Sequence, residues 1–137
     1  MPVKYVTAND GQLVVERWVG AISHAELTSH GKRQHKDAAI APGAKVFVDA
    51  RLAEFPETAF DLARELSDLN GAADRKARTS MCAAIFRGDD FDRAKEWETR
   101  ARDNGLNVIV FSSLEVACTW LGTDPVATQK LLDSIGI

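Results

Sequence analysis

The sequence has few cysteines, no long apolar run and no large excess of charge. Cys82 and Cys118 are the only cysteines in 137 residues, too few for a disulfide scaffold, which favours a reducing compartment. No apolar run approaches the roughly 18 residues of a membrane helix, and the residues after Met1 lack the apolar core of a signal peptide. The net charge of −3, from 17 basic and 20 acidic residues, provides no field that would attract nucleic acid or anionic lipid. We therefore expect a cytoplasmic protein that binds no nucleic acid and does not insert stably into a membrane.

The motifs of common cofactor, metal and catalytic sites are also missing. The sequence contains no GxGxxG or GxxxxGK[ST] phosphate loop, no GxSxG elbow and no HExxH pair. His24, His30 and His35 fall on one expected helix at spacings that do not converge on a metal, so we interpret them as part of a solvated polar face. The acidic cluster Asp89–Asp92 stands at an expected helix start, where carboxylates favour the positive end of the helix dipole. We expect neither a cofactor nor a metal.

Strand and helix signals alternate along the whole chain. Asn9-Asp10-Gly11 lies between two strand-like runs and predicts an antiparallel hairpin that Gly20 closes. A helix follows from Ser23 to about Ala39, then a strand over 45–49 and a loop over 50–55. The next segments are a helix from Pro56 to Asn70-Gly71, a strand over 80–86, a helix over 91–105 and a strand over 108–111. Two helices end the chain, one that stops at Gly122 and one from Asp124-Pro125 to about Ser134.

Three of these helix starts carry capping signals. Ser23 with Glu26 forms a capping box, and Ser112 with Glu115 has the same spacing. Pro56 is well placed in the first turn of the helix that it begins.

The order β-β-α-β-α-β-α-β-α-α predicts an α/β fold. Strands that alternate with helices of 10 to 15 residues imply right-handed crossovers and a largely parallel sheet. The opening hairpin adds an antiparallel edge, so the sheet is mixed, with four to five helices around it. With 45% hydrophobic residues and neither a linker nor a repeat, residues 1–137 are expected to form one domain.

Charge is unevenly distributed along the chain. Residues 45–74 contain three basic and seven acidic residues, whereas residues 75–102 contain eight basic and five acidic ones. Such faces are usually solvated, and they also suit a protein partner or a homodimer.

The order of elements and several segments resemble the STAS fold (sulfate transporter and anti-sigma-factor antagonist), and in particular SpoIIAA-like bacterial proteins related to STAS and SEC14 domains. The resemblance runs from about Val3 to Gly122. The segments that carry it are the opening hairpin, Gly20-Ala21-Ile22-Ser23, the strand Val46–Asp49, the strand end Val110-Phe111 and the helix Glu115–Gly122.

The resemblance implies a position for a phosphorylation switch. Anti-sigma-factor antagonists carry an Asp-Ser-Ser-Gly turn in which one serine is phosphorylated. An ungapped placement from Asp49 puts Glu57, Thr58, Ala59 and Phe60 on these four positions, so only Thr58 keeps a hydroxyl. The resemblance therefore implies a SpoIIAA-like domain without the usual phosphoserine switch.

Three functions remain open. The first is a non-catalytic regulatory domain that binds a protein partner through an acidic surface, for which the candidate residues are Glu57, Thr58, Asp61 and Glu65. The second is a module for a small apolar or lipid ligand, as the SEC14 relation implies. Its candidate pocket aromatics are Phe55, Phe60, Phe86, Phe91 and Trp97, which could equally be ordinary core residues. The third is an enzyme that uses Cys82 or Asp49 near a strand end.

Overall fold

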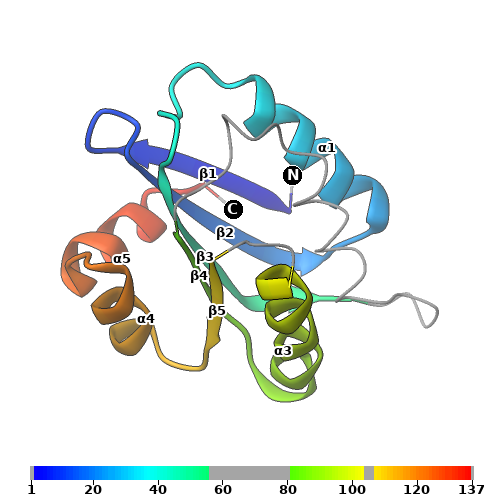
Figure 1. Ribbon diagram of the computed structural model, residues 1–137. Coiled ribbons are helices and arrows are strands. Elements are labelled where there is room, and N and C mark those ends of the chain that lie inside the picture. Colours follow the sequence, from blue (N-terminus) through cyan, green and yellow to red (C-terminus); the bar gives the residue numbers. More distant parts are fainter. Residues whose placement is uncertain (1, 56–80, 104–106, 137) are drawn as a thin grey trace.

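A mixed sheet forms the centre of the molecule. The computed structural model describes residues 2–55, 81–103 and 107–136, and in these residues five strands follow the order β1-β2-β3-β4-β5 (Figure 1). The strands are β1 (Val3–Ala8), β2 (Leu13–Ala21), β3 (Lys45–Glu54), β4 (Met81–Ile85) and β5 (Val108–Phe111). β1 pairs with β2 in antiparallel orientation, and every other pair is parallel. The predicted mixed α/β fold is confirmed.

The hairpin between β1 and β2 turns where the sequence predicts it. Asn9 and Asp10 both have positive φ, 54° and 56°, and Gly11 follows at 82°. Asparagine and aspartate tolerate this left-handed conformation better than most residues, which is why the pair is suited to a tight turn between strands.

Four helices in the described residues cover the two faces of the sheet. They are α1 (His24–Lys36), α3 (Gly88–Asp103), α4 (Leu114–Leu121) and α5 (Pro125–Asp133). Figure 1 shows α1 and α3 on one face and α4 and α5 on the other. The expected helix over residues 56–71 lies outside the described residues.

Alternate residues of the strands contribute side chains to two separate hydrophobic cores, one on each face of the sheet. On the face of α1 and α3, a first cluster includes Val14, Trp18, Val48, Phe86 and Trp97. On the face of α4 and α5, a second cluster includes Leu13, Val15, Phe47, Leu121 and Leu132. The central strand β3 contributes to both clusters, because its neighbouring side chains point to opposite faces.

The structure confirms some of the predicted helix ends and corrects others. Ser23 caps α1 and accepts a hydrogen bond from the backbone N–H of Glu26, but α1 ends at Lys36 and not near Ala39. Ser113, and not Ser112, caps α4, with its Oγ accepting from the N–H of Val116 at 3.4 Å. Helix α5 starts at Asp124-Pro125 as predicted, with Asp124 as its cap and Pro125 in its first turn.

Strand β3 is longer than the sequence predicts. The expected loop over 50–55 is strand as far as Glu54, because β2 continues beyond Trp18 and offers Val19, Gly20 and Ala21 as pairing partners. Between the pairs Arg17–Asp49 and Val19–Leu52, β3 advances by three residues while β2 advances by two. The extra residue makes a β-bulge, which changes the direction of the side chains beyond it.

Candidate functional site

A polar cluster lies on the face of the sheet that α4 and α5 cover, level with the carboxyl ends of β4 and β5. Arg17 of β2 and Asp49 of β3 are direct neighbours in the strand register, and Asp49 is buried with 6% exposure. Open α/β sheets place their binding sites outside the carboxyl ends of the strands. This edge is therefore the position at which the fold itself favours a site.

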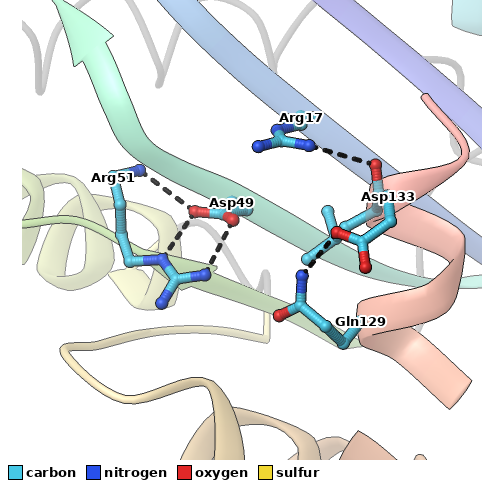
Figure 2. A network of polar contacts seen from close by, with 6 residues as sticks. Arg17, Asp49, Arg51, Gln129 and Asp133 are labelled. Atoms are coloured by element: carbon cyan, nitrogen blue, oxygen red, sulfur yellow. Dashed lines mark hydrogen bonds and ion pairs between the residues drawn. The ribbon is translucent and has the colours of Figure 1, made fainter. Parts of the chain in front are cut away.

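Arg51, which follows Asp49 at the bulge, neutralises the buried carboxylate. Its Nε and Nη2 donate to the two oxygens of Asp49 at 2.9 Å each, and its backbone N–H donates to Oδ1 at 3.1 Å (Figure 2). Hydrogen bonding to Asp49 raises the pKa of the Arg51 guanidinium. A bidentate pair of this kind fixes side-chain geometry, so the Asp49–Arg51 pair fixes the two side chains at the bulge in the middle of β3.

Arg17 connects the same edge to the C-terminal helix. Its Nη1 donates to the carbonyl oxygen of Leu132 at 3.3 Å, near the end of α5, where carbonyl groups favour a cation. Its Nε is buried and has no hydrogen-bond partner among the described residues. On α5, Gln129 Nε2 donates to Asp133 Oδ1 at 2.9 Å (Figure 2).

A second polar cluster is buried on the opposite face, between β2 and α1. One oxygen of Glu16 accepts from Trp18 Nε1 at 3.0 Å and from His30 Nε2 at 2.8 Å, and the other accepts from Gln34 Nε2 at 2.6 Å. Burial alone would raise the pKa of Glu16. The charge of His30 and the hydrogen bonds from His30, Gln34 and Trp18 more than offset burial and hold the pKa below its usual value of 4.5.

The interpretation of the histidines as a solvated face is wrong for His30. Its side chain is 1% exposed and lies between the rings of Tyr5 and Trp18, with centroid distances of 5.9 and 6.2 Å. The missed signal is the helical spacing of Leu27, His30 and Gln34, which puts the imidazole on the same side of α1 as the buried leucine. His35 is exposed, in agreement with that interpretation.

The candidate residues of the phosphorylation surface, Glu57, Thr58, Asp61 and Glu65, all lie outside the described residues. Phe60, one of the candidate pocket aromatics, does so too. The other four aromatics come together at the first cluster. Phe86 and Trp97 are buried in it, and Phe55 and Phe91 are partly buried against it.

Both cysteines are free and buried. Burial, with a smaller contribution from the charge of Glu16, raises the pKa of the Cys82 thiol well above its usual range, which disfavours the nucleophilic thiolate. In the described part of the chain, no group of three or more histidine, cysteine, aspartate or glutamate side chains could hold a metal ion. None of the helices described is long and apolar enough to span a membrane.

Comparison with solved structures shows what the architecture is. No model of a known protein family matches the chain, and no curated protein is significantly similar to it. An anti-sigma factor antagonist from Mycobacterium paratuberculosis matches with a TM-score of 0.56 at 12% identity, over 88% of this chain and 94% of that chain. An uncharacterised protein of the DUF3478 family with a SpoIIAA-like fold, from Shewanella loihica PV-4, matches with a TM-score of 0.54 at 15% identity, over 87% of this chain and 91% of that chain. The chain has the SpoIIAA-like fold. The resemblance seen in the sequence is thereby confirmed at the level of the fold.

Proposed function

We propose that this SpoIIAA-like domain is a non-catalytic, cytoplasmic regulatory domain that acts by binding a protein partner. The observation that carries the proposal is the fold it shares, over most of both chains, with an anti-sigma factor antagonist. The state of the candidate catalytic groups supports it. Asp49 is bonded on both oxygens to Arg51, and the Cys82 thiol is buried with a raised pKa, so neither is poised for acid–base or nucleophilic chemistry.

The partner surface that we propose begins immediately beyond the carboxyl end of β3. The Asp49–Arg51 pair lies at the bulge in the middle of β3, pairing with β2 holds the strand as far as Glu54, and the residues that follow in the chain include the acidic Glu57, Asp61 and Glu65. Acidic side chains in this position would steer a partner with a basic surface. A paired strand followed by a charged segment supports recognition more directly than catalysis.

We further propose that this domain works without the usual phosphoserine switch. Thr58 has the only hydroxyl in the four positions that correspond to the Asp-Ser-Ser-Gly turn, and Ala59 and Phe60 follow it. Binding would then be controlled by the presence of the partner and not by a phosphate on the turn.

Charge reversal tests the partner surface. The variant E57K/D61K/E65K is compared with D92K/E96K/D103K, which has the same net charge and changes three exposed acidic residues of α3. Each is used as bait in lysate of the source cells, and captured proteins are quantified by mass spectrometry. We expect the first variant to lose at least tenfold of the proteins that wild type enriches, the control to retain them, and both to melt within about 2 °C of wild type. Full capture by the first variant would overturn the proposal.

A second candidate function is binding of a small apolar or lipid ligand between the sheet and its helices. One observation favours it: the indole Nε1 of Trp97 is buried and has no hydrogen-bond partner among the described residues. Buried indole N–H groups usually find an acceptor, and a ligand oxygen would supply one. Phe55, Phe86 and Phe91 belong to or pack against the same cluster as Trp97.

Intact mass of protein isolated from its source cells separates these possibilities. A mass excess that is present under native conditions and lost on denaturation would favour the ligand-binding function. A covalent phosphate on Thr58 would contradict the proposed absence of the switch. The native spectrum also tests the expected homodimer, since a dimer doubles the mass.

A further inference from the structure

Helix α1 has very little apolar surface with which to attach to the sheet. Between His24 and Lys36, Leu27 is its only large apolar residue, and this side chain is fully buried. Helix α4, by contrast, buries Leu114, Ala117, Cys118 and Leu121 against the opposite face. Docking of most helices depends on an apolar face, so α1 must depend on other contacts to an unusual degree.

Those other contacts are polar, and Glu16 of β2 is at their centre. Glu16 accepts hydrogen bonds from His30 and Gln34, one turn apart on the inner side of α1. A third contact holds the end of the helix, where the hydroxyl of Tyr5 on β1 donates to Asp37 Oδ2 at 2.6 Å. Glu16 itself is 3% exposed, so the bonds that it accepts form largely away from water, where they are strong when complete and costly when one partner is lost.

The ionisable groups around this cluster are few. His30 faces Glu16 from α1, Tyr5 faces the imidazole from β1, and the Cys82 thiol on β4 experiences the charge of Glu16. Asp37 and Arg33 act on Tyr5 at the C-terminal end of the helix. Among the described residues, Glu16 is therefore the one carboxylate that binds the inner side chains of α1.

We propose that the Glu16 carboxylate acts as a latch: its hydrogen bonds hold α1 on the sheet. Neutralising its charge then releases α1 while β3, β4 and β5 remain folded. Trp18, His30 and Gln34 all donate to Glu16, so a proton on the carboxyl places a donor against a donor and removes the negative charge that faces His30. Leu27 and the Tyr5–Asp37 hydrogen bond are too little to retain the helix, which then detaches. Release uncovers the Trp18 ring, which packs edge-on against Phe86 at a centroid distance of 6.5 Å.

The pH dependence of the latch follows from the direction of the pKa shift. The pKa of Glu16 is lower in the folded protein than its usual value of 4.5. A carboxyl of this kind contributes stability that is fully present above the usual pKa and is lost as the pH falls through the lower folded value. Release of α1 is therefore expected below about pH 4.5.

The variant Glu16→Gln tests the latch at neutral pH, because it removes the charge and replaces one acceptor oxygen with a donor amide. The control is Glu54→Gln, which makes the same change at an exposed site. Hydrogen exchange is followed by mass spectrometry. We expect the amides of α1 in Glu16→Gln to exchange at least tenfold faster than in wild type, and those of β3, β4 and β5 to change less than twofold. Unchanged protection of α1, or an equal loss of protection everywhere, would overturn the proposal.

A titration of the wild-type protein provides the answer if Glu16→Gln does not fold. Backbone amide resonances are followed by NMR from pH 7 to pH 3. The latch predicts that the resonances of α1 change at a higher pH than those of β4. A single transition shared by α1 and the sheet would show that Glu16 contributes only to global stability and would refute the latch. Neither experiment depends on partner binding, so its outcome is separate from that of the proposed function.

Discussion

The fold leaves almost no room for a side chain at Gly11. Its φ is +82°, and a Cβ at this position would lie 2.1 Å from the carbonyl oxygen of Ala39. Gly43 has a similar φ of +76°, but nothing lies within 4 Å of its Cβ position. We expect Gly11→Ala to lower the free energy of unfolding by roughly 3 kcal/mol, because strain and overlap add, and Gly43→Ala to lower it by roughly 1 kcal/mol, from strain alone.

Urea denaturation of the two glycine variants measures this difference directly. Equal losses would mean that backbone strain accounts for both effects and that the contact between Gly11 and Ala39 contributes nothing. The hairpin turn and the segment before β3 would then be less tightly coupled than their backbone bonds, Ala41 N–H to Gly11 at 2.9 Å and Lys45 N–H to Gln12 at 2.8 Å, indicate.

Single residues are also where sequence reasoning fails, and His30 shows why. A polar residue on a mostly polar helix is normally exposed, so the histidines of α1 are read as a solvated face. The residue that changes this interpretation is Glu16, 14 positions earlier on another element. Arg17 and Leu132 are 115 positions apart and pose the same difficulty. Burial of a polar group depends on a partner that only the tertiary structure brings close.

At the scale of elements, the sequence and the structure assign different N-cap residues to α4, and the two assignments can be tested against each other. The sequence favours Ser112 as the cap, whereas in the structure the hydroxyl of Ser113 accepts from Val116 N–H and donates to Glu115. We expect Ser113→Ala to cost about 1 kcal/mol of stability and Ser112→Ala less than about 0.5 kcal/mol. Thermal unfolding of both variants tests this, and a larger loss for Ser112→Ala would restore the original assignment.

The ends of strands are difficult to predict from the sequence for a related reason. The apolar run Val46–Val48 predicts a strand but not its end, because the residues after Asp49 are mixed in character. What extends β3 to Glu54 is the continued presence of β2 beside it, together with a bulge that corrects the register. Strand length is set by the neighbouring strand, whereas capping residues such as Ser23 and Asp124 act within their own helix and can be recognised locally.

At the scale of the whole molecule, the fold class is predicted correctly because it depends on the order of strands and helices and not on their exact ends. Alternation of strands and helices, with the crossover rule, is enough to predict a mostly parallel sheet with one antiparallel edge. The candidate site is less accessible to such reasoning. The Asp49–Arg51 pair needs the bulge, and the acidic residues proposed to bind a partner follow it in the chain outside the described residues.

The sheet also divides the hydrophobic core in two, and this division predicts which pairs of core substitutions have additive effects on stability. Leu27 belongs to the cluster under α1 and α3, whereas Leu121 and Leu132 belong to the cluster under α4 and α5. Each Leu→Val change should cost about 1 kcal/mol. Because the sheet separates Leu27 from Leu132, the double variant should equal the sum of the single ones within about 0.5 kcal/mol.

Leu121 and Leu132 provide the contrasting pair, since they share one cluster. Their double variant should depart from additivity by more than about 0.5 kcal/mol, because the two shortened side chains relax into a common space. Urea denaturation of all the single and double variants measures both couplings. Strong coupling between Leu27 and Leu132 would mean that the strands transmit packing changes from one face to the other. Release of α1 would then disturb the whole sheet, and the latch at Glu16 could not act alone.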